Sequence, residues 1–483
     1  MQPKIELLSH DLIGRILDEG FQLMQKPGIK VQSAKARELL LAAGASAEGD
    51  ILKIPEKIIR GALDTTPAEF HLYDRSGKRQ VHYGGDSVQF DPGSSGVSIL
   101  DPETLEHKSA TTPDLVRLVK VCEMLPQYAA QSTAVVCNEV PKEIGDLYRL
   151  YVVLSFSQKP IVTGSFSIRT LGTMIDMLAI FTGGRESLAD KPHAVFDVCP
   201  SPPLIWSEFG GDNLIELARA RVPAELISMP LAGAAAPVTL LGSVVQHAAE
   251  SLSGIAIHQL ANPGAPIVWG GAPAIFDMRR GTTPMGAIET AMIDAAYAQV
   301  GKSLNLPTHT YLGASDAKIV DAQAGMESGI SALVGALAGI NMISGAGMLD
   351  FLACQSAEKL VVDAEGIAMA QRLLAGIEVR TETLATALFE GINFKGDFLK
   401  QKITRELFSK EQNLPSAVID RDSMRGWQAS GRLDTFARAK IRTRELLSAY
   451  HRPYCDPRQE NELRKMVEDL AHKAGMDDLP QMG

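Results

Sequence analysis

Short apolar runs alternate with longer helical patterns along the chain from about residue 113. Each run precedes a loop rich in Gly, Ser, Pro or Ala, and a helix is predicted after the loop. The predicted strands span 128–132, 160–164, 193–198, 225–229, 266–270, 308–312 and 341–344. The predicted helices span 145–156, 171–181, 213–221, 240–260, 287–304 and 322–338. Because apolar strands recur at intervals of roughly 30–40 residues with helices between them, the pattern predicts a parallel sheet covered by helices.

Seven strands are clear in this pattern, and an eighth is predicted either at 360–363 or earlier in the chain, at 87–91. No glycine-rich dinucleotide-binding motif opens the first strand–helix unit, which favours a closed barrel over an open sheet. We therefore predict an α/β fold of the (β/α)8, or TIM, barrel type.

The segments on either side of the predicted barrel have different patterns. Apolar positions at helical spacing between residues 7 and 17, followed by turn-rich short strands over 68–110, predict a helical and small β extension over residues 1–110. The barrel is expected over 111–390, and a C-terminal helical extension rich in Lys and Arg over 391–483. This extension is interpreted either as a solvated helical cap or as a docking surface for an acidic partner.

Charge and cysteine content narrow the class of function. The 483 residues include 47 Lys and Arg and 57 Asp and Glu, a net charge of −10, so no basic face for nucleic acid is expected. Five widely spaced cysteines argue against a disulfide framework and for a reducing compartment. The charged N-terminus lacks the apolar core of a signal peptide, and Pro and Gly interrupt the apolar stretch 224–245. We therefore expect a cytoplasmic protein without a membrane span.

Catalytic groups of a barrel lie at the carboxyl ends of its strands and in the loops that follow. Two such loops, 269–281 and 309–323, combine aromatic and charged residues. Metal-binding motifs, a nucleophile elbow and a phosphate-binding loop are all absent from the sequence, so it indicates neither a metal site nor a protein nucleophile. Simpler interpretations of the charged residues are that Asp321 caps the next helix and that Asp316 pairs with Lys318.

At these loops, which read WGGAPAIFDMRRG and HTYLGASDAKIVDAQ, the chain resembles the trimethylamine methyltransferase family of corrinoid-dependent methyltransferases. The matching stretches are 262–292, 306–328, 335–350 and 358–376, with shorter ones at 40–46, 398–407 and 423–427. The resemblance implies a TIM barrel whose mouth receives a corrinoid protein. That partner would carry the cobalamin, so this chain is expected to hold no tightly bound cofactor of its own.

The archaeal trimethylamine enzymes of the family carry pyrrolysine, and this sequence shows none. It is similar to the branch without pyrrolysine, which includes glycine betaine methyltransferases. A quaternary amine leaves as a neutral amine when its methyl group is taken by cobalt, so the protein has mainly to position the methyl group and exclude water. Glycine betaine is the first substrate expected, with proline betaine, carnitine and γ-butyrobetaine as alternatives, and a homo-oligomer is the assembly that the resemblance suggests.

Site residues are assigned from their positions in the predicted loops. Aromatic faces suit a quaternary cation, and the candidates are Phe90, Trp269, Tyr311 and Phe351. The candidates for binding a substrate carboxylate are Arg279, Arg280, Lys318 and His309. Asp316 or Asp350 would offset the charge of the cation. The candidate catalytic residues are Asp316, Lys318 and His309. For Trp269 and Phe351, packing in the core is the alternative interpretation.

Two other functions are open at this stage. Lys318 could act as a Schiff-base amine in a barrel lyase or aldolase. The barrel could also bind a betaine or dock a partner without catalysing a reaction.

Overall fold

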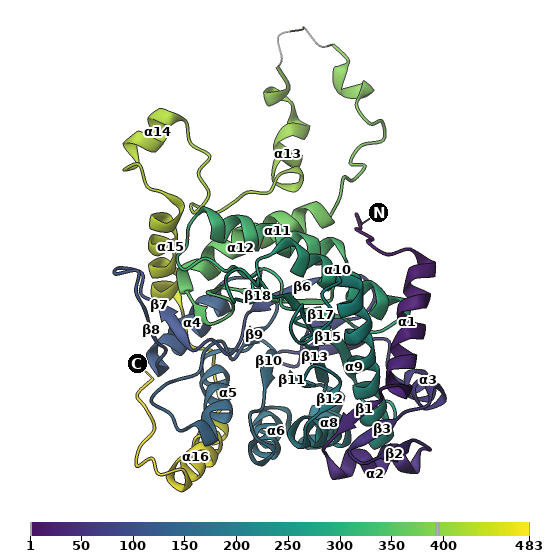
Figure 1. Cartoon of the computed structure of the whole chain (residues 1–483). Helices are drawn as coiled ribbons and strands as arrows, with labels where there is room; N and C mark the ends of the chain where they lie inside the picture. The colour runs from purple at the N-terminus through teal and green to yellow at the C-terminus, as the bar shows by residue number, and fades with distance from the viewer. Residues whose placement is uncertain (1, 392–393, 395–396, 483) are drawn as a thin grey trace.

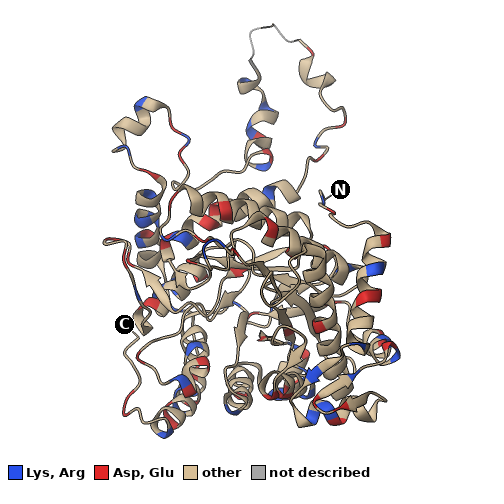
Figure 2. Ribbon diagram, in the orientation of Figure 1, with Lys and Arg blue, Asp and Glu red and all other residues tan. Residues whose placement is uncertain are grey.

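The computed structural model describes residues 2–391, 394 and 397–482. Parallel strands lie at the centre of the molecule, and helices surround them (Figure 1). Charged residues belong mostly to the surrounding helices and the terminal segments, with few in the central strands (Figure 2). The fold is therefore mixed α/β, with its apolar core between the strands and the helices.

The parallel strands belong to two sheets. The larger has the order β15-β13-β11-β10-β9. Its strands are β9 (Gln131–Ser132), β10 (Ile161–Gly164), β11 (Ala194–Val198), β13 (Ala224–Ser228) and β15 (Ile267–Gly271). The smaller has the order β17-β18-β6. Its strands are β17 (His309–Thr310), β18 (Met342–Ala346) and β6 (Gln89–Pro92).

Backbone contacts link the two sheets at both pairs of edges. Between β15 and β17, Trp269 forms a parallel bridge with Thr308, and its backbone N donates to Pro307 O at 2.8 Å. Between β6 and β9, the backbone N of Ala129 donates to Phe90 O at 2.9 Å. A further parallel bridge joins Gly96, beyond β6, to Val135.

The seven strands expected in the repeating region are confirmed, with boundaries shifted by a few residues. The eighth is at the earlier of the two predicted places, because β6 pairs in parallel with β18. The alternative at 360–363 is wrong, since these residues lie in helix α12 (Ala357–Leu374). Parallel pairing thus begins inside the range assigned to the N-terminal extension, before residue 111.

Helices follow the strands in chain order, as the pattern predicts. They are α4 (Thr112–Met124), α5 (Gly145–Phe156), α6 (Ile168–Thr182), α7 (Arg185–Asp190), α8 (Glu208–Ala220), α9 (Leu240–Ala261), α10 (Ile288–Ser303), α11 (Ala322–Leu337) and α12, with the 3-10 helix η1 (Lys142–Ile144) before α5. Side-chain caps fix several starts: Ser207 caps α8, Thr239 caps α9 and Asp321 caps α11. The capping role expected for Asp321 is confirmed.

The N-terminal region mixes helices with short strands, as expected. Its elements are α1 (His10–Gln25), β1 (Ile29–Val31), α2 (Ala34–Ala42), β2 (Ser46–Glu48), β3 (Ile51–Lys53), α3 (Glu56–Thr65), β4 (Phe70–Tyr73), β5 (Arg79–Tyr83), β7 (Ser98–Leu100) and β8 (His107–Ser109). Further two-residue strands lie in loops of the repeating region: β12 (Ile205–Trp206), β14 (Leu231–Ala232), β16 (Ala274–Ile275), β19 (Met348–Leu349) and β20 (Cys354–Gln355).

The C-terminal region is helical. Its elements are η2 (Thr386–Phe389), η3 (Asp397–Lys400), α13 (Lys402–Glu411), α14 (Met424–Ala429), α15 (Thr435–Ala449) and α16 (Pro457–Lys473). Helix α15 packs on α4 and α12, and α16 packs on α5 and α6, whereas α13 and α14 project from the body (Figure 1). Leu446 of α15 and Leu463 of α16 are buried, so these two helices act as a cap on the outer helices.

The apolar stretch 224–245 divides into β13, a loop with β14, and the first turns of α9, as its Pro and Gly residues predict. Within the part of the chain that the structure describes, we find no helix with the length and apolar character needed to cross a bilayer.

An apolar layer closes one end of the space between the central strands. Ala130, Val162, Val195, Val268 and Met342, which lie in or beside five of the eight parallel strands, form a buried cluster with residues of the β4–β5 hairpin. Because side chains alternate along a strand, the residues two positions further on share the same face and lie closer to the carboxyl ends. The hairpin therefore seals the amino ends of the strands and leaves the carboxyl ends for chemistry.

A buried ion pair ties the last helix of the repeating region to its neighbours. Lys359 Nζ lies 2.6 Å from Asp363 Oδ2 on the same helix and donates to Ser328 Oγ of α11 at 2.6 Å. The backbone N of Gly347, just after β18, donates to Asp363 Oδ2 at 2.7 Å. The pair thus connects α12, α11 and the end of a central strand.

Replacing Lys359 with Met should destabilise the protein by about 3 kcal/mol, because it leaves a buried carboxyl without its counter-charge. Urea unfolding followed by circular dichroism measures this. The matched control is K402M. The Lys402 side chain is 87% exposed and forms an i,i+4 ion pair with Glu406. That change should leave the unfolding midpoint almost unmoved. Equal shifts for the two variants would contradict the structural role of the buried pair.

Candidate functional site

Polar side chains follow the apolar layer at the carboxyl ends of the central strands. Two residues beyond the apolar residues of β9, β11 and β18 come Ser132, Asp197 and Ser344. The corresponding positions of β10 and β15 are Gly164 and Gly270. A Cβ atom at Gly270 would lie 3.0 Å from His309 Nδ1, so glycine at this position allows His309 to pack closely against β15. The change from apolar to polar within two residues marks this level as the candidate site.

Three carboxyl groups, which we call the acidic cluster, lie at this level: the buried Asp91 of β6 and Glu225 of β13, and the partly buried Asp197 of β11. Each accepts one hydrogen bond from a hydroxyl group. Asp91 accepts from Ser344, Asp197 accepts from the Tyr311 hydroxyl at 2.8 Å, and Glu225 accepts from the Tyr83 hydroxyl at 3.1 Å. Asp197 and Glu225 are register partners on adjacent strands, and His309 connects Glu225 with Ser344, the hydroxyl partner of Asp91.

Burial strongly favours the protonated form of the acidic cluster. It raises the pKa of Asp197 to about 7 and raises the pKa values of Asp91 and Glu225 well above their usual range, with repulsion between the carboxylates adding to the effect. One oxygen of each group has no hydrogen-bond partner among the described residues: Asp91 Oδ2, Asp197 Oδ1 and Glu225 Oε2. Buried carboxyls with free oxygens suit a ligand that brings positive charge.

His309 and Tyr311, both predicted from the sequence, lie beside the acidic cluster. The Nε2 atom of His309 is 2.9 Å from Ser344 Oγ and 3.7 Å from Glu225 Oε2. Burial lowers the pKa of His309 to about 3, so the ring is a neutral imidazole and its contact with Glu225 is not an ion pair at neutral pH. The Tyr311 hydroxyl lies between Asp197 and Ser94 Oγ, which is 2.9 Å away.

A buried arginine completes this level of the structure. Arg149, on α5, is fully buried, and its Nη1 atom donates to Ser95 Oγ and to Thr133 O, both at 2.9 Å. Charge interactions connect it with Asp197 and Tyr311. The candidate site therefore contains an acidic and a basic component side by side.

Lys318, Asp350 and Phe351 form a separate group, which we call the rim group, near the surface. Lys318 Nζ lies 3.0 Å from Asp350 Oδ1 and 3.9 Å from the centre of the Phe351 ring, and its side chain is 54% exposed. The face of Phe351 is therefore occupied by a lysine of the same chain. A half-exposed, paired ammonium also lacks the desolvated setting that a Schiff-base lysine needs.

Asp316 stabilises the conformation of the loop that precedes helix α10. Its two carboxyl oxygens accept hydrogen bonds from the backbone N atoms of Met285 and Gly286, at 2.8 and 3.1 Å. Burial raises the pKa of Asp316 to about 6. Lys318 donates to the backbone O of Asp316 at 2.6 Å, which differs from the side-chain pairing expected between them. Both carboxyl oxygens of Asp316 thus serve the conformation of the loop before α10.

Phe90 and Trp269 lie on the outer side of the strands. The Trp269 indole Nε1 donates to Tyr297 O of α10 at 2.9 Å, and its ring lies against Gly301 of the same helix. Phe90 lies with Ser328 of α11 and Val362 of α12. Successive side chains of a strand point to opposite faces. Phe90 and Trp269 each stand next to a residue that faces the enclosed space, so their own side chains face the helices. For Trp269, the packing interpretation agrees with these contacts, and a role in a substrate cage does not.

Arg279 and Arg280 lie in an exposed turn after β16. The Arg279 guanidinium makes two hydrogen bonds with the carboxylate of Asp277, at 3.0 and 2.9 Å, and its side chain is 88% exposed. The two guanidinium N–H groups of Arg279 that could bind a substrate carboxylate already donate to Asp277, and Arg279 does not lie at the acidic cluster.

Sequence reasoning missed five residues of the site: Tyr83, Asp91, Arg149, Asp197 and Glu225. A usable signal was present in three of them, because an acidic residue interrupts an otherwise apolar strand in QFDP, AVFDV and AELIS. Charged residues are seldom fully buried without a functional reason.

Among the described residues, no group of three or more His, Cys, Asp or Glu side chains is arranged to hold a metal ion.

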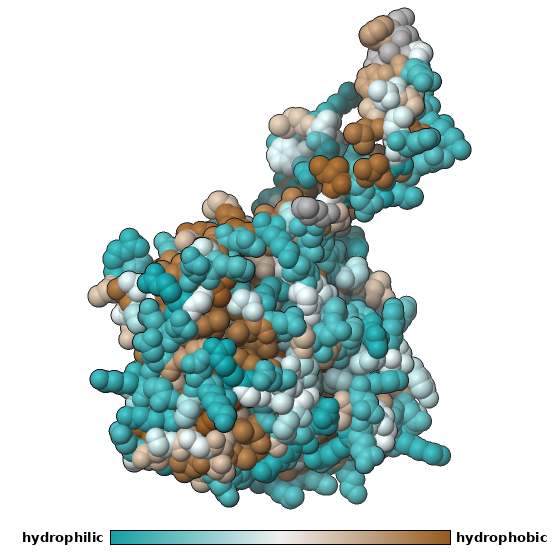
Figure 3. Space-filling model, turned by 90° about the vertical axis from the view of Figure 1, so that its right-hand side faces the viewer, coloured by the Kyte–Doolittle hydropathy of each residue, from teal (hydrophilic) through white to brown (hydrophobic). Residues whose placement is uncertain are grey.

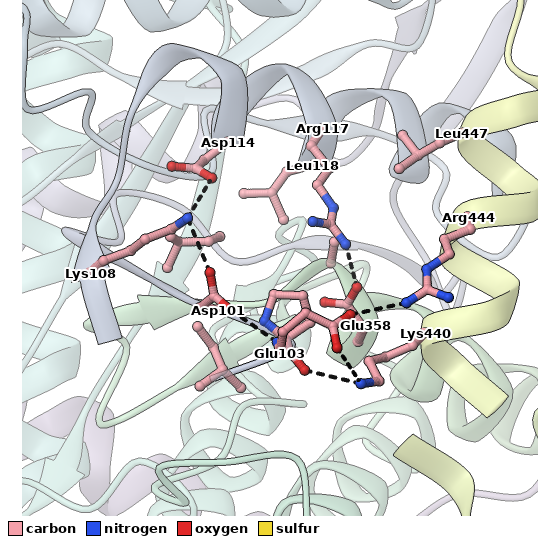
Figure 4. A pocket seen from close by; sticks show the side chains of 14 residues that line it. Asp101, Glu103, Lys108, Asp114, Arg117, Leu118, Glu358, Lys440, Arg444 and Leu447 are labelled. Atoms are coloured by element: carbon pink, nitrogen blue, oxygen red, sulfur yellow. Dashed lines mark hydrogen bonds and ion pairs between the residues drawn. The ribbon is translucent and has the colours of Figure 1, made fainter. Parts of the chain in front are cut away.

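A second charged site lies on the outside, where the C-terminal helix α15 meets α4 and the β7–β8 hairpin (Figure 4). This pocket has a volume of about 350 Å³. Its charged side chains pair with one another: Glu103 with Lys440 and Arg444, both at 3.0 Å, and Arg117 with Glu358. Such pairing fastens α15 to the body and leaves little free charge for a ligand.

Comparison with known proteins places these features in a family context. The family model described as trimethylamine methyltransferase (MTTB) matches residues 1–475. The chain is 29% identical to a trimethylamine methyltransferase of Desulfitobacterium hafniense, over 94% of this chain and 92% of the relative. It is 28% identical to a glycine betaine methyltransferase of the same species, over 98% of both chains. The fold is similar to that of the monomethylamine methyltransferase of Methanosarcina barkeri, with a TM-score of 0.52, 13% identity, and coverage of 92% of this chain and 89% of that one.

The raised pKa of Asp197 predicts a pH-dependent effect of D197N. In the unfolded chain an Asp titrates near about 3.9, and in the folded protein Asp197 titrates near about 7. Folding therefore favours the protonated form, and this residue lowers stability as pH rises through that interval. Asn stays neutral, so D197N should raise the melting temperature at pH 8 by roughly 2 °C or more and at pH 5 by only about a third as much, because at pH 5 little of the interval between the two pKa values has been crossed.

Differential scanning calorimetry at the two pH values measures this. The control is D176N, which changes an aspartate whose side chain is 47% exposed and which pairs with Arg185. A gain for D197N of the same size at both pH values would show that the carboxyl is not held protonated by burial.

Proposed function

Because the chain belongs to the trimethylamine methyltransferase family, we propose that it transfers a methyl group from a small quaternary amine to the cob(I)alamin of a separate corrinoid protein. The family membership confirms the resemblance seen in the sequence and makes the chain a methyltransferase. Glycine betaine is the first substrate that we propose, with proline betaine, carnitine or γ-butyrobetaine next. A relative named glycine betaine methyltransferase, aligned over 98% of both chains, supports this order.

We also propose that the eight central strands close into a (β/α)8 barrel. The two parallel sheets contain eight strands in total, and backbone contacts join them at β15–β17 and at β6–β9. In such a barrel the carboxyl ends form the mouth at which chemistry takes place. The acidic cluster lies at this end, above the apolar layer closed by the β4–β5 hairpin.

The acidic cluster is the observation that carries the proposal. A quaternary ammonium ion keeps its positive charge at every pH and cannot donate a hydrogen bond, so it binds through charge and through aromatic faces. Asp91, Asp197 and Glu225 supply the negative charge, and Tyr311, whose hydroxyl bonds to Asp197, supplies an aromatic ring. In the bound state we expect at least one of the three carboxyls to be ionised, because the cation offsets the repulsion that keeps them protonated.

In the proposed reaction the C–N bond breaks, the nitrogen keeps its electron pair, and the product is a neutral tertiary amine. The corrinoid acceptor supplies the nucleophile, so this chain needs no nucleophilic side chain of its own. Its task is to hold the methyl group in one orientation and to exclude water. The neutral imidazole of His309, bonded to Ser344, is suited to a positioning role.

Apolar side chains near the carboxyl ends of the strands suit docking of the acceptor protein. Exposed apolar residues lie in the loops and first turns that follow β13, β15 and β17: Val238, Leu241, Met278, Ile288, Met292, Met326 and Ile330. On the face shown in Figure 3, hydrophobic side chains gather on the upper part of the body among polar ones. Exposed apolar patches of this kind often mark protein–protein contacts. A cytoplasmic location and a homo-oligomeric assembly stay predictions from the sequence.

The direct test uses the purified chain, chemically reduced cob(I)alamin and a panel of quaternary amines. We expect at least one carboxylate-bearing betaine to convert cob(I)alamin to methylcobalamin, followed by absorbance, with release of the matching tertiary amine. Omission of the chain is the control. Tight binding of a betaine with no methylation across the whole panel would instead support a non-catalytic binding protein.

Two aromatic residues predicted for the cage should behave differently. W269F removes the hydrogen bond to Tyr297 on the outer side of the strands, so it should lower the melting temperature and leave substrate affinity within about twofold of wild type. Y311F removes the hydrogen bonds to Asp197 and Ser94 and should weaken binding about tenfold. Titration calorimetry with the active betaine measures both affinities. A larger loss of affinity for W269F than for Y311F would contradict the arrangement described here.

A further inference from the structure

One edge of the Arg149 guanidinium is unused. Nη1 donates to Ser95 Oγ and Thr133 O, whereas Nε and Nη2 are buried and have no hydrogen-bond partner among the described residues. The Nε and Nη2 hydrogens point to the same side and form a fork that matches the two oxygens of a carboxylate. A buried fork without an acceptor is unfavourable, so its presence indicates that a ligand supplies the acceptor.

The nearby carboxyls of this chain do not fill that fork. Asp146, one turn earlier on α5, accepts from the backbone N atoms of Leu147 and Phe166 and from the Thr170 hydroxyl, at 2.6–2.7 Å. Asp197 interacts with Arg149 through its charge but takes its hydrogen bond from Tyr311. Burial lowers the pKa of Arg149 to about 10, which still leaves it protonated at neutral pH. A permanent cation is thus fixed in the interior with a free carboxylate-binding edge.

Arg149 lies at the carboxyl ends of the strands, next to the acidic cluster. Ser95 follows β6 and Thr133 follows β9, so its two hydrogen bonds fix it at that level. The Phe166 ring, just beyond β10, covers one face of the guanidinium at 4.4 Å. Ser94, the neighbour of Ser95, bonds to Tyr311, which in turn bonds to Asp197. A short chain of contacts therefore connects the basic fork with the acidic cluster.

We propose that Arg149 is the specificity-determining residue of the site and binds the carboxylate of the substrate through its free Nε and Nη2 edge. This proposal rests on the proposed function and deepens it. Opposite charges placed side by side select a zwitterion whose ammonium lies at the acidic cluster and whose carboxylate lies at Arg149. The enzyme then prefers carboxylate-bearing betaines to choline or tetramethylammonium, which offer the same cation without an anion.

Binding measurements on the full chain test this without any corrinoid. Titration calorimetry compares a betaine panel (glycine betaine, proline betaine, carnitine and γ-butyrobetaine) with choline and tetramethylammonium. R149Q should weaken binding of the preferred betaine about 10- to 100-fold and leave the affinities for choline and tetramethylammonium within about twofold. R149K keeps the charge without the fork, so it should recover only part of the lost affinity.

The matched control is R75Q. Arg75 is partly buried and, like Arg149, covers an aromatic ring, that of Phe181 at 4.3 Å, but it donates to the backbone O atoms of Leu154, Ser157 and Tyr454, away from the acidic cluster. This variant should leave betaine affinity unchanged. Melting curves of all variants show whether each is folded.

The outcomes separate this proposal from the proposed function. Equal loss of affinity for betaines and for carboxylate-free cations, or no loss in R149Q, overturns the role of Arg149. So does the absence of betaine binding by wild type. Methylation of cob(I)alamin from choline as fast as from every betaine would retain methyl transfer and remove the carboxylate site. Arg149-dependent betaine binding without methylation would retain the carboxylate site and remove methyl transfer.

Discussion

Two buried carboxyl groups, Asp91 and Glu225, and the partly buried Asp197 lie together without a hydrogen-bonded lysine or arginine among the described residues, and the rest of the site follows from this constraint. Burial opposes the ionisation of all three carboxyl groups, and for Asp91 and Glu225 repulsion from the neighbouring carboxylates opposes it further. A ligand with a permanent positive charge relieves both effects. The folded protein therefore holds an unfavourable arrangement in the interior, which the cationic substrate that we propose would convert into a favourable one.

The surrounding fold makes such an arrangement possible. Asp197 and Glu225 are register partners on adjacent parallel strands, and Asp91 is the register partner of Ser344. Hydrogen bonds between the paired strands fix the backbone positions of these residues. The apolar layer beneath, closed by the β4–β5 hairpin, keeps water away from one side. Rigid strands thus carry the charges, whereas Asp316 and Lys318, in the loop 313–321, mainly stabilise loop conformation.

The sequence predicted the alternation of strands and helices because a buried parallel strand leaves a strong mark, a short apolar run before a loop. It did not predict which side each residue faces. Trp269 and Phe90 were assigned to the site by position, yet alternation turns both toward the helices. His309 and Tyr311 are two residues apart and share the inner face, so both were found. Asp91 and Glu225 were missed because they lie within strands rather than in the loops after them.

The same electrostatics has a consequence for turnover in the proposed reaction. The substrate enters as a cation and, once its methyl group has gone, its nitrogen is neutral. The attraction that held it at the acidic cluster then disappears, while the repulsion among the carboxyls returns and favours their protonation. Carboxylate binding at Arg149 is the same before and after the transfer, so it adds to affinity without distinguishing product from substrate. Discrimination between the two therefore resides in the acidic cluster, which explains why the carboxyls are several and buried rather than single and exposed.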